Sequence, residues 1–357
     1  MCKRELIRRS LKTSAYYRQD PILGWQPNSN VRGTHNQPGS FSTTFQTNTL
    51  GLRDRDYPLE KSAATRVVVL GDSFTWGWGV NDDEIYTERL EALLLNTEVI
   101  NLGVTAYSTG QELDYFKLKG VPYRPDIVLL AFCLNDFEEV ENWRSWLEKT
   151  RSGNAMVQLT NKEMGPSFRT WMAEHFYLYR FIIDRINTSK PLVNFLVKIG
   201  LKSELSGYEA LDTNLRPALK NYTPEFVQHL ERTKGYLRVL RDEVRSLQAR
   251  FIIVLVPSLQ AVEDVAFHHA IAYTTYEPED FDLWKPYRLV EAFAEEEHIE
   301  IINPLPSFLT AGSNGEKLYL KNDMHFTPRG HEVFAGEIYK YLTSHSSSEL
   351  TTLSDRR

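Results

Sequence analysis

Four segments of the chain carry the groups that acyl transfer requires, and each comes after an apolar run that predicts a strand. Gly71-Asp72-Ser73-Phe74 follows the first run, Gly103 the second, Asn135-Asp136 the third and Asp323-Met324-His325 the last. In open α/β sheets, ligands bind beyond the carboxyl ends of the strands. We therefore expect the four segments to meet on one rim of a sheet.

Ser73 is the candidate nucleophile on this rim. A serine hydroxyl is a weak nucleophile until a base within hydrogen-bond reach takes its proton. His325 is the candidate base, and Asp323, two residues earlier, is the candidate carboxylate that fixes its tautomer. The amides of Ser73 and Gly103 and the side chain of Asn135 are candidate donors to the oxyanion of the tetrahedral intermediate.

The apolar runs predict the fold class. Five continuous runs are short and rich in β-branched residues, which is typical of strands buried on both faces of a parallel sheet. They are Val67–Leu70, Val99–Leu102, Ile127–Leu130, Phe251–Val256 and Ile299–Ile302. Helical patterns lie between them, so we expect an α/β, flavodoxin-like three-layer sandwich with a mostly parallel sheet of about five strands.

Capping patterns predict where three helices begin. Thr109-Gly110-Gln111-Glu112 matches a capping box, and Thr223 and Thr327 are each followed by proline, a good cap and first-turn pair. Residues 138–221 interrupt the order of strands and helices and are rich in aromatics. We expect a helical insertion there, which is either a lid over a binding site or a set of core helices. Trp143 and Trp146 are its candidate substrate-binding residues.

The four segments resemble the sequence blocks of the SGNH, or GDSL-type, serine hydrolases. Leu70–Phe74 looks like the first block, Asn101–Gly103 the second, Leu134–Asp136 most of the third and Asp323–His325 a short form of the last. The resemblance covers roughly residues 66–136 and 250–342. It implies an esterase or acyl hydrolase with a Ser-His-Asp triad and no cofactor. The segment Gly51–Asp54 is similar to the front end of bacterial members from glycan-modification loci.

Two positions depart from that family pattern. Cys133 stands where the third block usually begins with glycine, and one residue instead of two separates Asp323 from His325. Cys133 is either a small buried apolar residue or a reactive thiol. Asp136 and His331 are interpreted as structural residues, the alternative for His331 being a metal pair with His325. Gly77-Trp78-Gly79 hints at a phosphate loop but lacks the required spacing and lysine.

Composition and charge exclude several classes of protein. The 357 residues include 42% hydrophobic and 25% charged ones, which is ordinary for globular proteins. The formal net charge of -6 gives no reason to expect a nucleic-acid partner. No stretch is long enough for stable membrane insertion, and the basic first residues are not followed by the apolar run of a signal peptide. We therefore expect a cytoplasmic protein with no metal; its oligomeric state stays open.

These observations divide the chain into four predicted parts. A basic N-terminal segment (1–19) precedes an extended arm with turns (20–62), the hydrolase domain (63–343) and a flexible tail (344–357). The expected substrate is a small-molecule or glycan ester, and an O-acyl group on a carbohydrate is one interpretation. An acyltransferase using the same site and a non-catalytic binding module on the same fold stay open as alternatives.

Overall fold

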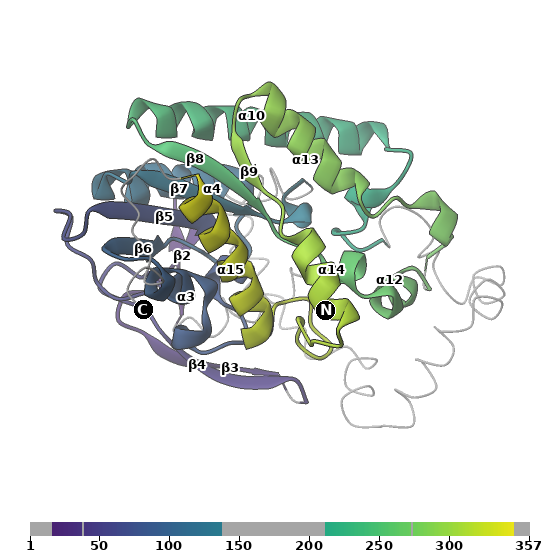
Figure 1. Ribbon diagram of the computed structural model, residues 1–357, viewed down its shortest axis with the longest axis horizontal. Helices are drawn as coiled ribbons and strands as arrows, with labels where there is room; N and C mark the ends of the chain where they lie inside the picture. The colour runs from purple at the N-terminus through teal and green to yellow at the C-terminus, as the bar shows by residue number, and fades with distance from the viewer. Residues whose placement is uncertain (1–15, 38, 138–210, 273, 346–357) are drawn as a thin grey trace, which may run out of the picture.

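The centre of the computed structural model is a five-stranded parallel sheet (Figure 1), in a structure that describes residues 16–37, 39–137, 211–272 and 274–345. The strand order is β6-β5-β7-β8-β9, and every neighbouring pair is parallel. The strands are β5 (Thr65–Gly71), β6 (Thr97–Asn101), β7 (Ile127–Phe132), β8 (Arg250–Leu255) and β9 (Glu300–Ile302). Each overlaps one of the five predicted runs, so the predicted sheet is confirmed.

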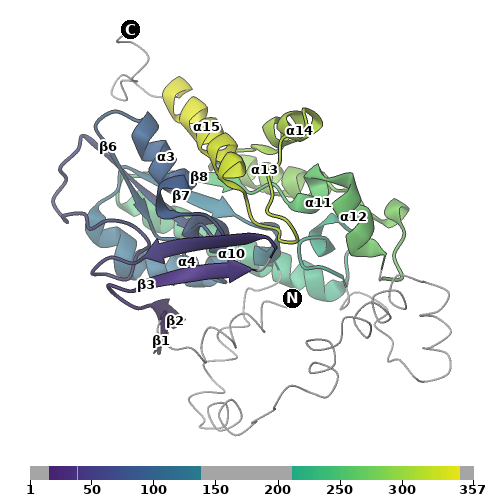
Figure 2. The same ribbon diagram turned by 90° about the horizontal axis from the view of Figure 1, so that it is seen from below.

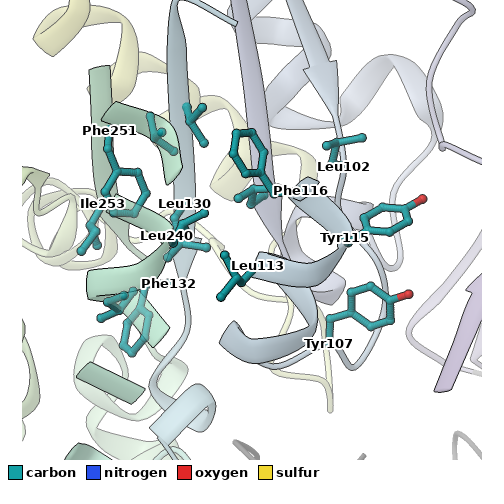
Figure 3. Close-up of a cluster of buried hydrophobic side chains, with 14 of the residues drawn as sticks. Leu102, Tyr107, Leu113, Tyr115, Phe116, Leu130, Phe132, Leu240, Phe251 and Ile253 are labelled. Carbon is teal, nitrogen blue, oxygen red and sulfur yellow. The ribbon is translucent and has the colours of Figure 1, made fainter. Parts of the chain in front are cut away.

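Helices cover both faces of this sheet. Successive side chains of a strand point to opposite faces, so Val68 and Leu70 of β5 belong to one buried cluster and Val67 and Val69 to the other. Figure 3 shows part of the first cluster. The first is closed by α4 (Thr109–Tyr115), α10 (Pro224–Ser246) and α13 (Lys285–Glu296). The second is closed by α3 (Tyr86–Leu93), α14 (Leu305–Ser313) and α15 (Pro328–Ser344). The predicted three-layer sandwich is confirmed.

Shorter helical elements complete the described chain. The α-helices are α2 (Ser73–Trp76), α11 (Leu259–Val262) and α12 (Asp264–Ile271). A π-helical turn spans Phe116–Gly120, and 3-10 turns span Asp82–Glu84, Val121–Tyr123, Leu134–Phe137, Arg216–Ala218 and Pro278–Asp280. No helix among the residues described here has both the length and the apolar character needed to cross a bilayer.

Two of the predicted helix starts are confirmed, and one lies a residue earlier. The Thr223 hydroxyl accepts from Phe226 N at 3.1 Å, and the Thr327 hydroxyl accepts from Gly330 N at 3.1 Å. In α4 the cap is Ser108, which forms the capping box with Gln111, and Thr109 is the first helical residue. Ser108 and Thr109 both have an acid or amide three residues on, so the pattern fitted two registers.

The extended strands and turns of the N-terminal arm form two antiparallel hairpins. Strands β1 (Tyr17–Asp20) and β2 (Gly24–Pro27) form one, and β3 (Arg32–Gln37) and β4 (Phe41–Gln46) form the other. Figures 1 and 2 show β3 and β4 outside the central sheet. Most of the predicted insertion, including Trp143 and Trp146, lies outside the described residues, as do residues 1–15 and 346–357.

Candidate active site

Ser73 lies at the turn between strand β5 and the short helix α2. The Asp72 carboxylate caps this helix and accepts a hydrogen bond from Phe74 N at 2.9 Å. Gly77 ends the helix with φ 81, a left-handed conformation that glycine adopts without steric cost. The serine is 5% exposed, and the sharp turn holds its hydroxyl at the carboxyl edge of the sheet.

His325 and Asp323 approach Ser73 from the loop that precedes α15. His325 Nε2 lies 2.7 Å from Ser73 Oγ, and His325 Nδ1 lies 2.5 Å from Asp323 Oδ1. The same carboxylate oxygen accepts from the backbone N–H of His325 at 2.9 Å. An aspartate readily makes such a bond to the backbone two residues on, so the one-residue spacer brings the carboxylate and the ring together.

Aromatic rings surround the histidine. The Phe74 ring centroid lies 4.8 Å from that of His325, and the Trp78 centroid lies 6.1 Å away. Phe74 comes directly after the candidate nucleophile, so the β5–α2 turn supplies both the hydroxyl and an aromatic ring that packs against His325. Packing of this kind restricts the rotamers of the imidazole, which keeps Nε2 directed at the hydroxyl.

Trp78 is a site residue that the sequence did not reveal. Its indole N–H, the only donor of that side chain, acts as a hydrogen-bond donor to the Asp323 carboxylate. Burial raises the pKa of Asp323, but the hydrogen bonds and the charge of His325, with a smaller contribution from the Trp78 bond, outweigh burial and hold this pKa below its ordinary value. A tryptophan between two glycines just after the Ser73 turn was the available signal; it hinted at a phosphate loop, which the missing spacing and lysine argued against.

The predicted oxyanion donors have different surroundings. Asn135 is 2% exposed and lies in the 3-10 turn that comes soon after β7; its Oδ1 has no hydrogen-bond partner among the described residues. The Gly103 amide instead donates to Asn101 Oδ1 at 2.8 Å. A Cβ at Gly103 would lie 2.4 Å from Trp76 N, so close packing against α2 accounts for this glycine. The Gly103 N–H is thus already engaged by a side chain, and its oxyanion role stays a prediction.

Three neighbouring polar residues make hydrogen bonds within the protein that are typical of structural residues. Cys133 Sγ donates to Asp72 Oδ1 at 3.4 Å, and burial together with Asp72 and Asp136 raises the pKa of the thiol. Asp136 accepts from Cys133 N at 3.0 Å. Burial, followed by the charge of Arg53, lowers the pKa of His331 to about 3. Its neutral ring accepts from Tyr86 N at 3.3 Å, and no metal-binding group of three or more His, Cys, Asp or Glu occurs in the described ranges.

The arrangement can perform nucleophilic acyl substitution. A hydroxyl, an imidazole and a carboxylate stand in hydrogen-bonding series, the order in which a serine is deprotonated and the resulting imidazolium is supported. The neutral His331, bonded to the α3 backbone, is held apart from this series by its own contacts. The geometry brings Ser73, His325 and Asp323 together.

Several solved structures are similar to this chain. The chain is similar in structure to a lipolytic protein of the G-D-S-L family from Veillonella parvula, with 14% identity and a TM-score of 0.41 over 78% of this chain and 99% of that one. A lipase/acylhydrolase from Enterococcus faecalis has 12% identity and a TM-score of 0.41 over 80% and 100% of the two chains. A catalytic mutant of an acetylxylan esterase from Geobacillus stearothermophilus has 13% identity and a TM-score of 0.41 over 79% of this chain and 95% of that one. None of the curated proteins matches the chain.

The family itself follows from the sequence. The model of the GDSL-like lipase/acylhydrolase family matches residues 69–333, from the nucleophile strand through the histidine loop and into α15. This span is well over half of the chain and contains every described site residue. The chain therefore belongs to the GDSL-like lipase/acylhydrolase family and is a hydrolase that acts on ester bonds.

Proposed function

We propose that the protein is a serine esterase that forms an acyl-enzyme on Ser73, with His325 as general base and Asp323 as its supporting carboxylate. The observation that carries the proposal is the contact series: 2.7 Å from the hydroxyl to one ring nitrogen and 2.5 Å from the other to the carboxylate. Each separation is already within the hydrogen-bond reach that proton transfer requires.

The reaction runs in two matched halves. His325 Nε2 takes the hydroxyl proton while Ser73 Oγ bonds to the carbonyl carbon, and the carbonyl electron pair moves onto oxygen. The intermediate collapses, the C–O bond to the alcohol breaks, and the imidazolium protonates the departing alkoxide. Water then gives a proton to His325, adds to the acyl carbon and expels Ser73 Oγ. The serine takes the proton back, and a carboxylic acid is released.

Three donors are assigned to the oxyanion in this proposal: the amides of Ser73 and Ala106 and the side chain of Asn135. Ala106 takes the place of Gly103, whose N–H is engaged. Tyr107 N donates to Val104 O at 3.1 Å and closes a turn in which Ala106 has φ 70. Strained backbone of this kind concentrates at functional sites. Thr105 O accepts from Trp25 Nε1 at 3.2 Å, so the N–H across the same trans peptide points away from the arm.

We assign the acyl group to a recess lined in part by Phe74, the residue that follows Ser73. The recess has a volume of about 10 Å³, which is room for about one water-sized group. It is lined by Phe74, Cys133, Leu134, Asn214, Val256, Pro257 and Ser258. Phe74 and Leu134 flank two proposed site residues, and Asn214 Nδ2 lies 3.7 Å from Met324 Sδ in the histidine loop. Acetyl esters are therefore the proposed substrates, with O-acetylated carbohydrate as the proposed natural class.

The test is a comparison of wild type with Ser73→Ala. Aryl esters with acyl chains of two to eight carbons and acetylated sugars serve as substrates, and a fluorophosphonate probe reports the reactive serine. We expect acetate esters to be cleaved fastest, and Ser73→Ala to be folded, unlabelled and inactive. Full turnover by that variant would remove Ser73 from the mechanism. An added acceptor alcohol that outcompetes water would instead assign transfer to the same acyl-enzyme.

A further inference from the structure

The segment that carries the catalytic carboxylate is packed against the N-terminal arm. Gln37, at the end of β3, donates through Nε2 to Asn322 O at 3.2 Å, one residue before Asp323. A Cβ at Gly79 would lie 2.3 Å from Leu320 Cδ1, so the loop after α2 also packs closely on this segment. The carboxylate thus lies in a short loop that is held from two directions.

Trp78 contacts both the N-terminal arm and the segment that carries Asp323. Its indole bonds the Asp323 carboxylate, and its ring packs between the hairpin and the catalytic histidine. The His35 ring stacks on it with centroids 4.3 Å apart, and the Phe41 ring meets it edge-on at 6.2 Å. His35 in turn stacks on Phe45 of β4 at 4.4 Å. The indole is therefore clamped by aromatic side chains of both hairpin strands.

His35 is suited to this place as a neutral, flat ring. It is 8% exposed, and its Nδ1 has no partner among the described residues. Burial, followed by the nearby charges of Arg53 and His325, lowers the pKa of His35 to about 3. A neutral ring stacks on the indole without repelling the imidazolium that forms at His325 during the reaction, whereas a second cation there would oppose that charge.

We propose, on the basis of the proposed esterase function, that the β3–β4 hairpin orients the catalytic carboxylate: His35 fixes the indole of Trp78, and that indole holds Asp323 in the position from which it supports His325. Trp78 and His35 are positioning residues, since neither is assigned a contact with substrate. The N-terminal arm is then part of the esterase site and acts through Asp323.

The first test uses two tryptophan variants that differ in one respect. Trp78→Phe keeps an aromatic ring and removes the N–H that bonds the carboxylate. Trp76→Phe makes the same change two residues earlier, where the indole N–H has no partner in the described chain. We expect Trp78→Phe to lower kcat on an aryl acetate by roughly ten-fold to a hundred-fold, the usual effect of losing a hydrogen bond to a charged group. KM should stay within three-fold, and Trp76→Phe should keep kcat within three-fold.

A double-mutant cycle separates positioning from general disturbance. In an Asp323→Ala background the carboxylate is gone, so Trp78→Phe should change the rate of fluorophosphonate labelling by less than about two-fold. A loss that persists in full in this background would show that Trp78 does not act through Asp323 and would overturn the inference. Equal kcat in Trp78→Phe and Trp76→Phe would overturn it as well.

A second pair of variants covers the case in which Trp78→Phe does not fold. His35→Ala removes the ring that stacks on the indole, and His35→Phe restores a flat neutral ring. We expect a kcat loss in the first and recovery in the second, with the loss again absent after Asp323→Ala; equal rates in both would reject the role of His35. If Ser73→Ala retains activity, the proposed function itself fails. If Ser73→Ala is inactive while the Trp78 and His35 variants match wild type, only this inference fails.

Discussion

Replacing Arg53 by methionine should destabilise the fold through the loop that carries Trp78. The Arg53 side chain is fully buried, and its guanidinium binds Asp82 at 2.7 Å, Gly77 O at 2.6 Å and Val80 O at 2.7 Å. It also donates to Trp76 O at 3.1 Å. Methionine has a similar length and none of these donors, so the substitution removes the hydrogen bonds while keeping most of the packing.

The expected loss in the free energy of unfolding follows from the backbone carbonyls that lose Arg53 as their hydrogen-bond donor. Thr44 O loses only a longer bond of 3.3 Å, and Gly77 O retains a weak bond from Val80 N at 3.4 Å. Trp76 O and Val80 O are therefore the two carbonyls that lose a close donor and have no backbone donor among the described residues. A buried polar group left unsatisfied costs about 1–3 kcal/mol, which gives roughly 2–6 kcal/mol for the pair. The Asp82 carboxylate is half exposed, so water can replace Arg53 as its hydrogen-bond donor.

The assay is urea unfolding at neutral pH, with Arg55→Met as the matched control. Arg55 is half exposed and pairs with Glu88 and Glu91 on the surface, so its loss should cost less than about 1 kcal/mol. Arg53→Met should lower the free energy of unfolding by several times that amount and reduce kcat. If both variants lose less than 1 kcal/mol, the buried carbonyl cluster does not hold the loop as argued.

Four other changes test the site. Asn135→Ala should lower kcat by roughly 10²–10³ with little change in KM, as for other oxyanion donors; a change in KM alone would assign Asn135 to substrate binding. Cys133→Gly should enlarge the acyl recess and raise the hexanoate-to-acetate ratio of kcat/KM by about ten-fold; an unchanged ratio would place the acyl group elsewhere. Ala106→Gly should remove the strain at φ 70, raise the free energy of unfolding by about 1 kcal/mol and preserve turnover; a loss of stability would contradict that reading. Since the folded pKa of Asp323 is depressed, its stabilising contribution is complete above the unfolded value near 3.8 and is lost as pH falls through the lower folded value. Unfolding free energies from pH 6 to 3 should therefore converge between wild type and Asp323→Asn only below about pH 4, and a constant difference would refute the assignment.

The sheet was predictable because its signals are local. Runs such as Val67–Leu70 are continuously apolar, and burial on both faces of a parallel sheet demands that pattern. The Thr223 and Thr327 caps were predictable for the same reason, since cap and partner lie three residues apart. The hairpin of β3 and β4 gave no such signal: it is rich in polar residues because much of its surface faces water, and its apolar contacts are with Trp78, far along the chain.

The site was predictable in its reactive groups and less so in their surroundings. Ser73, His325 and Asp323 have residue types that only a few arrangements use together, and the family blocks fixed their order. The surroundings of Gly103 were not predictable: a glycine is required there by contact with α2, and its amide donates to an asparagine side chain. Trp78 was missed because the carboxylate it bonds belongs to a distant loop, and a single sequence carries no record of that pairing.

The contacts of the arm have a consequence for how the molecule can be divided. A fragment that began at residue 63 would contain the whole parallel sheet and all three reactive groups. It would lack Arg53, His35 and Gln37, and with them the donors and rings that hold the loop after α2 and the segment before His325. Such a fragment would contain every sequence block of the family but would lack the contacts that hold the loops of the site in place. For grafting, truncation or directed evolution, the smallest transferable esterase therefore includes the β3–β4 hairpin and Arg53.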